Sequence, residues 1–269
     1  MITAPNASAI QPLTPEQMSR YLEALREDFD NANVIYQREN RIVIRWRDAV
    51  SDQPLIIKMW ARPDLKNSLR QLLRIAPCDH EWRALVQLHG INMSVPRPLG
   101  HCRVRPRIAG YTGALFTEDL GKCESATSYL KRLMHTGQEQ QVLHLENTLI
   151  NMAWQILDAG IIDPDHGLIN TVVQASGQLV RLDFELARYV IWPRLYTGMY
   201  SHMLGQMILF HAFSVQPDID RTTRFAERLH ERLHPSRRVL ARAGIYVRER
   251  LEQQYKYTGI DTRLILPWT

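Results

Sequence analysis

The chain of 269 residues is 45% hydrophobic and 23% charged, a balance typical of a globular protein folded as one large domain or two small lobes. No apolar run approaches the roughly 20 residues needed to cross a bilayer, and residues 1–13 lack the basic and apolar regions of a secretory signal. Three cysteines lie far apart without metal-type spacing, so we expect reduced thiols in a cytoplasmic protein: Cys78, Cys102 and Cys123.

Positive charge is concentrated in one late segment. The chain has a formal net charge of +5, and residues 221–256 alone contain ten Lys or Arg against four Glu. Most of these cations are Arg, whose planar fork suits phosphate and carboxylate groups. The segment therefore indicates either an anionic substrate or surface, or the solvated face of two amphipathic helices.

The first 120 residues favour strands around two helices. A helix is expected from Thr14 to Phe29, because Thr14 and Gln17 form a capping-box pattern around Pro15. Three strand-like runs, a second helix closed by Gly90 and two further strands follow, at 33–36, 41–46, 54–60, 77–89, 93–104 and 113–120.

Beyond Gly121 the pattern becomes helical. An apolar helix is expected at 143–159, a hairpin at 171–173 and 179–182, a buried helix at 200–213, and two basic helices after Pro217 and Pro235. The chain therefore predicts an α+β fold with two lobes. Residues 1–120 would form a β-rich N-terminal lobe with a leading helix, an antiparallel sheet and a second helix, and residues 121–269 a helical C-terminal lobe. A cleft between such lobes is where small ligands usually bind.

Polar residues with an ordered spacing follow the apolar helix. Asp165 and Asn170 lie five positions apart, and Asp183 comes 13 positions later, at the end of the second hairpin strand. Carboxylates at such places are costly to desolvate unless a cation requires them. Upstream, Lys58 falls on a strand and Glu81 at the start of a helix. In this order the set resembles the catalytic loop and metal-binding turn of the protein-kinase-like fold.

Three stretches carry a narrower resemblance, namely "HEWRALVQLHGINMSVPRPLG", "DPDHGLIN" and "LDFELAR". They are similar to the lipopolysaccharide core kinases, the bacterial Kdo and heptose kinases. The resemblance implies a compact protein-kinase-like bilobal fold and phosphorylation of a sugar hydroxyl, with ATP and Mg²⁺ as cofactors. It also implies a role for each site residue: proton acceptance for Asp165, metal binding for Asn170 and Asp183, phosphate binding for Lys58, positioning of that lysine for Glu81, and adenine contact for the backbone near Glu118.

Each site residue also has a structural alternative. Lys58 would then extend from an edge strand into solvent, and Glu81 would complement the helix macrodipole. Asp183 would cap a turn, and Asn170 would hydrogen-bond the backbone of its loop.

Two departures from the protein-kinase pattern leave a second function open. The turn between the first two strands is "QREN" rather than a G-x-G-x-x-G loop, and Asp163-Pro164-Asp165 replaces the usual His-Arg-Asp. We expect Asp163 to hydrogen-bond within its loop, while Glu185 suits either metal binding or a pair with Arg188. The alternative to an active kinase is a catalytically impaired pseudokinase or nucleotide-binding scaffold.

The length of one segment bears on the acceptor. Only 16 residues separate Asp183 from Tyr200, without an Ala-Pro-Glu sequence, which is short for a peptide-docking segment. We therefore expect an anionic sugar or lipid-linked saccharide of the lipopolysaccharide core, with peripheral contact at the inner face of the cytoplasmic membrane. A kinase of a small soluble acceptor is the alternative. A nucleic-acid partner is not expected, because the basic segment lacks interleaved aromatic residues.

Overall fold

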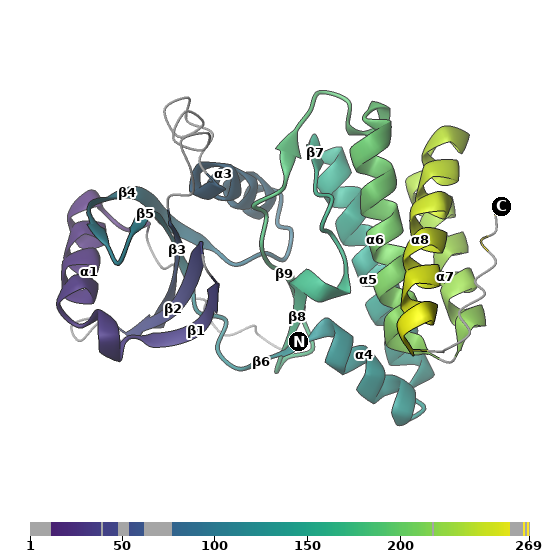
Figure 1. Cartoon of the computed structure of the whole chain (residues 1–269), viewed down its shortest axis with the longest axis horizontal. Coiled ribbons are helices and arrows are strands. Elements are labelled where there is room, and N and C mark those ends of the chain that lie inside the picture. Colours follow the sequence, from purple (N-terminus) through teal and green to yellow (C-terminus); the bar gives the residue numbers. More distant parts are fainter. Residues whose placement is uncertain are drawn as a thin grey trace, which may run out of the picture. The chain divides into compact units, whose positions relative to one another are not determined.

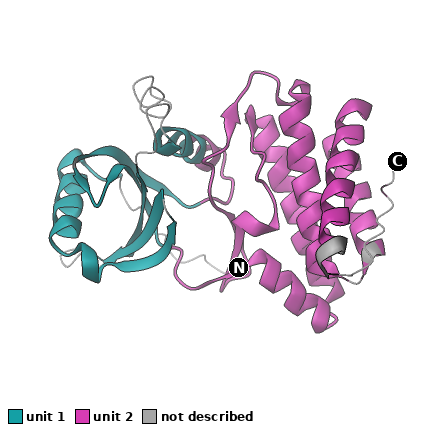
Figure 2. Ribbon diagram, viewed as in Figure 1, with its two compact units in different colours: residues 1–86, 96–119 teal, residues 87–95, 120–269 magenta. Residues whose placement is uncertain are grey.

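The computed structural model describes residues 12–38, 40–47, 54–61, 77–216, 218–258, 266 and 268. These residues form two compact units (Figure 2): Met1–Val86 with Pro96–Asp119, and Gln87–Val95 with Leu120–Thr269. The division differs from the predicted one at residue 120 mainly in Gln87–Val95, which belongs to the second unit. Backbone contacts explain this assignment, since the carbonyl of Ser94 accepts a hydrogen bond from the Arg181 N–H at 3.0 Å.

The first unit is a twisted antiparallel sheet with a leading helix. Its elements are α1 (Pro15–Glu27), η1 (Phe29–Asn31), β1 (Asn33–Arg38), β2 (Arg41–Arg47), β3 (Pro54–Ala61), α3 (Pro77–Gly90), β4 (Pro98–Ile108) and β5 (Tyr111–Glu118). The strand order is β1-β2-β3-β5-β4, and all four pairings are antiparallel (Figure 1). The antiparallel sheet predicted for this part of the chain is confirmed.

A local sequence signal fixes the start of α1. Thr14 Oγ1 accepts from the Gln17 N–H at 3.2 Å, and Gln17 Oε1 accepts from the Thr14 N–H at 2.8 Å, so the predicted capping box is confirmed. The helix ends at Glu27, slightly before the predicted end at Phe29. Its inner face packs on the sheet, where Leu25, Ile44 and Phe116 are fully buried.

The second unit is a helical bundle with two small sheets. Its elements are β6 (Cys123–Ser125), α4 (Ala126–His135), α5 (Glu139–Asp158), β7 (Ile161–Ile162), η2 (Leu168–Asn170), β8 (Thr171–Gln174), β9 (Leu179–Arg181), β10 (Arg188–Tyr189), η3 (Pro193–Leu195), α6 (Thr197–Val215), α7 (Ile219–Leu233) and α8 (Arg237–Thr258). One sheet has the order β6-β8-β9, and the other pairs β10 with β7. The predicted hairpin is β8–β9, with Val172 opposite Val180.

Helix α6 is the centre of the bundle. It packs against α4, α7 and α8, and Tyr200, Met203 and Leu204 are among its fully buried residues (Figure 1). An apolar helix surrounded by others needs no polar face, which explains why it reads as continuously apolar. The two basic helices expected next are α7 and α8; Pro217, predicted to separate α6 from α7, lies outside the described residues.

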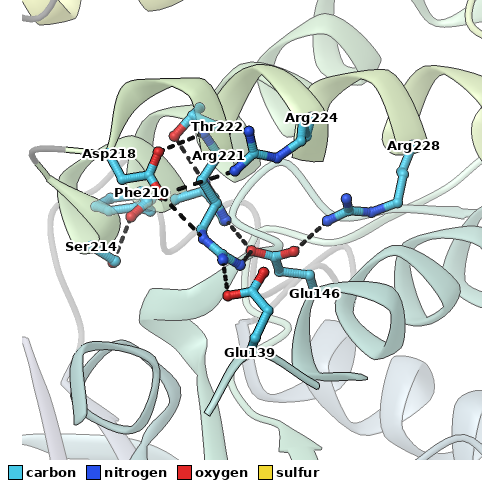
Figure 3. A network of polar contacts seen from close by, with 10 residues as sticks. Glu139, Glu146, Phe210, Ser214, Asp218, Arg221, Thr222, Arg224 and Arg228 are labelled. Atoms are coloured by element: carbon cyan, nitrogen blue, oxygen red, sulfur yellow. Dashed lines mark hydrogen bonds and ion pairs between the residues drawn. The ribbon is translucent and has the colours of Figure 1, made fainter. Parts of the chain in front are cut away.

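A buried polar network joins three of these helices. The Glu146 network consists of Glu139 and Glu146 on α5, His211 on α6, and Arg221, Thr222 and Arg228 on α7. Figure 3 shows the Glu146 carboxylate between the guanidinium groups of Arg221 and Arg228. Part of the late positive charge is thus paired inside the protein rather than solvated.

Two further expectations concern cysteines and membranes. The three cysteines are free thiols, and burial raises the pKa of Cys78 to about 12 and that of Cys102 to about 11. No helix in the described parts of the chain is long and apolar enough to cross a bilayer.

Candidate active site

Lys58 and Glu81 meet inside the first unit. Lys58 lies on β3 opposite Val43 and Leu115, and its Nζ is 2.6 Å from Glu81 Oε2 on α3. Both side chains are largely buried, with exposed fractions of 11% and 5%. The Lys58 ammonium also lies 5.0 Å from the centre of the Trp60 ring. An ammonium held in this way keeps its charge in one place while retaining donor capacity for a ligand.

Glu118 ends β5 and is tied to Arg97. Its N–H donates to the Arg97 carbonyl at 3.0 Å, and its Oε1 accepts from the Arg97 N–H at 2.8 Å. The backbone N–H of Glu118 is therefore engaged within the protein. An adenine contact in this region would have to use a different backbone group.

The second unit brings Asp165 and Asn170 together. The loop from Asp163 to Asn170 closes on itself, because Asn170 Nδ2 donates to the Asp165 carbonyl at 3.2 Å. The Asn170 carbonyl in turn accepts from the Leu182 N–H at 2.8 Å, which fixes the start of the turn containing Asp183. These contacts place all three predicted polar residues of this unit in one local structure.

Asp183 has an unusual backbone conformation. Its φ is 60°, in the left-handed region that non-glycine residues adopt only at some energetic cost. One of its carboxylate oxygens lies 3.4 Å from the Glu185 N–H. Backbone strain of this kind persists where surrounding contacts over-determine it, and it is found most often at functional sites.

A buried ion pair that the sequence did not reveal lies directly beneath the loop. The Asp163 carboxylate pairs with the guanidinium of Arg181, and both side chains are fully buried. The guanidinium also donates to the carbonyls of Asn170 at 2.9 Å and Asp165 at 3.2 Å. The Asp163 Oδ1 accepts from the Asp165 N–H at 3.2 Å. Asp163 does hydrogen-bond within its loop, and its partner Arg181 holds both ends of that loop.

Electrostatic surroundings favour the protonated form of Asp165. Burial raises the pKa of its carboxyl; Asp183 and Glu185 act in the same direction, and Arg181 and His202 oppose them. A carboxyl with a raised pKa is a stronger base when ionised, which suits proton transfer. His202, on α6, is a neighbour that the sequence did not point to; burial is the main cause that lowers its pKa.

Comparison with known proteins covers the same stretch of chain. Residues 57–188 match the Lipopolysaccharide kinase (Kdo/WaaP) family. Over these residues, just under half of its length, the chain is similar to that family. The matched range includes all six predicted site residues: Lys58, Glu81, Glu118, Asp165, Asn170 and Asp183.

A solved structure supports the fold of the whole chain. The structure described as "WaaP in complex with acyl carrier protein" is similar over 90% of this chain and 98% of that chain, with 15% sequence identity and a TM-score of 0.60. The kinase-like fold predicted from the sequence, with an antiparallel N-terminal sheet and C-terminal helices, is confirmed. No curated protein matches the chain.

The donor set of the second unit fits a hard cation. Within the described ranges, no three His, Cys, Asp or Glu side chains gather as a metal site. Mg²⁺ in phosphoryl-transfer enzymes needs only one or two protein ligands, because phosphate oxygens and water supply the rest. Asn170 uses its amide nitrogen on the Asp165 carbonyl, so its amide oxygen would be the ligand atom, and Asp183 would add a carboxylate oxygen. These two residues therefore fit Mg²⁺.

The predicted residues thus form two groups, one in each unit. Lys58, Glu81 and Glu118 belong to the first, and Asp165, Asn170 and Asp183 to the second. The residues missed by sequence reasoning are Arg181 and His202. A signal for Arg181 existed, since an arginine between Val180 and Leu182 in an apolar strand requires a buried acidic partner.

Proposed function

We propose that this protein is an ATP- and Mg²⁺-dependent kinase that phosphorylates a sugar hydroxyl of the lipopolysaccharide core. The arrangement of Asp165, Asn170 and Asp183 carries the proposal. One loop presents a carboxylate with a raised pKa, and its closing amide and the following strained turn offer two hard oxygen ligands. The similarity of residues 57–188 to the lipopolysaccharide kinase (Kdo/WaaP) family supports this reaction class.

Each residue has a physical task in this proposal. Lys58 binds nucleotide phosphates, and Glu81 keeps its ammonium in place through the 2.6 Å ion pair. Asp165 orients the acceptor hydroxyl and takes its proton. Asn170 and Asp183 hold Mg²⁺, which when bound neutralises charge on the phosphates. In phosphoryl transfer, positioning and charge neutralisation provide most of the rate enhancement.

The acceptor is assigned from chemistry. The segment after Asp183 is too short for a peptide-docking loop, which favours a glycan over a protein substrate. The family description names lipopolysaccharide, an anionic glycolipid, and the excess of arginine in this chain suits such an acceptor.

The test is transfer of phosphate to a defined acceptor. Purified protein is incubated with ATP, Mg²⁺ and a deacylated core oligosaccharide, and the product is followed by mass spectrometry for addition of one phosphate. Asp183→Asn should reduce turnover at least about a hundredfold, whereas Asp158→Asn, at an exposed position on α5, should not change it. Nucleotide binding without turnover on any core acceptor would favour a scaffold and refute the proposal.

A further inference from the structure

A large exposed apolar patch follows the proposed active-site turn. The patch, defined as Ile191, Trp192, Leu195 and Tyr196, has exposed fractions of 87%, 68%, 70% and 52%. Apolar patches of this kind on a soluble domain mark interaction sites. None of these four residues has a role in the proposed chemistry. Figure 1 shows the segment in green, leading from β9 past β7 to α6.

The patch is a fixed platform rather than a loose loop. Strand β10, which directly precedes the patch, pairs with β7, and the Val190 N–H donates to the Gly160 carbonyl at 2.9 Å. Val190 packs against the main core of the unit, and Pro193 is buried. The Tyr196 N–H donates to the Pro193 carbonyl at 3.1 Å. Residues 190 and 193 thus anchor the segment, while the intervening and following side chains point to solvent.

Charge around the patch has one sign along the chain. Residues 186–217 contain no Asp or Glu, whereas Arg188 and Arg194 flank the exposed apolar residues, and both are exposed. Beside β7, the strand that pairs with β10, Asp163 is fully buried and paired with Arg181, and Asp158, at the end of α5, is exposed. An apolar patch rimmed by arginine is complementary to a surface that is apolar inside and negative outside.

We propose that this patch docks on an anionic phospholipid bilayer. Trp192 and Tyr196 are the residue types that settle at the headgroup level, Ile191 and Leu195 enter the acyl boundary, and Arg188 and Arg194 meet headgroup phosphates. Because residues 186–217 contain no Asp or Glu, the rim of the patch is purely basic, and this combination of aromatic, aliphatic and basic side chains matches an anionic bilayer. The inference deepens the proposed function, because a lipid-linked acceptor is presented at a membrane.

The experiment measures binding to vesicles, which does not depend on kinase activity. Wild-type protein is floated with vesicles of one part phosphatidylglycerol to three parts phosphatidylethanolamine, and with neutral phosphatidylcholine vesicles. Binding to the anionic vesicles should be stronger and should fall as salt is raised. Trp192→Ser/Leu195→Ser should lower the vesicle partition coefficient at least tenfold, and Arg194→Gln about fivefold.

Matched controls lie on α8, the other basic surface. Ile245→Ser and Arg242→Gln remove an exposed apolar and an exposed basic side chain there, and neither should change binding. Unchanged melting temperatures exclude misfolding, and Leu195→Ser alone carries the test if the double variant does not fold. Turnover on the deacylated, soluble acceptor should stay at the wild-type level in every patch variant.

Three results would overturn the proposal. The first is that the wild-type protein does not bind anionic vesicles. The second is that the α8 control variants lose binding while the patch variants retain it. The third is that the wild-type protein self-associates in sedimentation and the patch variants do not. The last result would assign the patch to contacts between copies of this chain. A protein inactive on every acceptor but bound to vesicles through the patch would refute the proposed function and leave the docking surface standing.

Discussion

Asp165 is a half-buried carboxyl whose neighbours act on it in opposite directions. Burial, Asp183 and Glu185 favour its neutral form, while Arg181 and His202 favour the carboxylate. Since the folded-state pKa is raised, the stability that this group contributes is fully present below its unfolded pKa and is lost as pH rises through the folded pKa. At neutral pH the ionised Asp165 carboxylate therefore lowers the stability of the protein, while in the proposed function the same carboxylate accepts a proton.

Asp165→Asn should separate these two effects. We expect turnover to fall by about 10² to 10⁴, the usual contribution of a positioned proton acceptor. The melting temperature at pH 7.5 should equal or exceed that of wild type, because the asparagine has no buried charge. Steady-state kinetics and calorimetry measure the two quantities. A variant that keeps its turnover, or that loses activity only because it unfolds, would contradict the assignment.

The sequence could predict the proximity of those candidate residues that lie close together along the chain. Asp165, Asn170 and Asp183 lie in one loop and the hairpin that follows it, so their spacing alone brings them together. Arg181 was missed because its meaning depends on Asp163, 18 positions away, and on complete burial of both side chains. His202 was missed for the same reason, since only the packing of α6 places it near Asp165.

Strand β9 and the loop from Asp163 to Asn170 are held together through one guanidinium. Arg181 links the Asp163 carboxylate to two loop carbonyls, so breaking the pair leaves a buried charge without its partner. Removal of one member of such a pair typically costs about 3–5 kcal/mol, whereas apolar replacement of both members is often tolerated. The pair therefore acts as a positioning device for the loop as well as a stability element.

Asp163→Asn should lower the free energy of unfolding by about 3 kcal/mol. Asp163→Asn/Arg181→Met should recover part of that loss, because no unpaired charge is left. If Arg181 positions the loop, the double variant should still have a reduced kcat at a temperature where it is fully folded. Urea denaturation and kinetics on the same samples measure both. Full recovery of kcat in the double variant would reduce the pair to a purely structural role.

The Glu146 network gives a second test, on the joint of α5, α6 and α7. Glu146 is fully buried and contacts His211 at 2.9 Å and Arg221 at 3.4 Å, with Arg228 on its other oxygen (Figure 3). Burial raises the pKa of its carboxyl, but the combined effect of His211, Arg228 and Arg221 outweighs this and lowers it. The carboxylate is thus the charge on which three helices converge.

Glu146→Ala should destabilise the protein by about 3–5 kcal/mol, since two guanidinium groups and one imidazole lose their common acceptor. Glu139→Ala is the matched control on the same helix, because Glu139 pairs with Arg221 while its own side chain is 59% exposed. We expect the control to cost no more than about 1 kcal/mol. Chemical denaturation compares the two variants, and equal losses would show that the network does not depend on burial.

Prediction of elements succeeded where signals were strong and local. The capping box fixed α1, and the apolar periodicity of 143–159 indicated α5, although the helix begins earlier, at Glu139. The pairing of β7 with β10 was missed, because each strand has only two residues and the paired residues, Ile161 and Tyr189, lie far apart along the chain. Pairing between distant short segments leaves no periodic trace in sequence.

At the level of the whole chain, the change in composition near Leu120 marks one boundary but not the other. The first residues of α3 belong to the sheet unit, while the end of α3 and the turn after it belong to the helical unit. A helix that passes from one unit to the other has a continuous sequence pattern, so composition could not reveal the second boundary. Contacts of Ser94 with β9, 87 positions later at Arg181, decide its place.

The buried histidines make the stability of the whole protein sensitive to acid. Burial lowers the pKa of His166 to about 3, with Arg181 acting in the same direction and the Leu149 carbonyl opposing it. Burial is also the main cause that lowers the pKa of His211, although Glu146 opposes it. Both imidazoles are neutral in the folded protein at neutral pH, while in the unfolded chain they take up protons below about pH 6.5.

The free energy of unfolding should therefore fall as pH decreases from 6.5 towards 4.5. Because the unfolded state binds more protons, His166 should contribute a slope of roughly 1.4 kcal/mol per pH unit, and the lowered pKa of His211 acts in the same direction. Urea denaturation at half-unit intervals measures this dependence. His166→Gln, which can still donate to the Leu149 carbonyl, should remove the contribution of one histidine, while His144→Gln, at an exposed position on α5, should leave the slope unchanged. A slope that His166→Gln does not alter would mean that His166 is protonated in the folded protein, and that its burial does not lower the pKa of the imidazole.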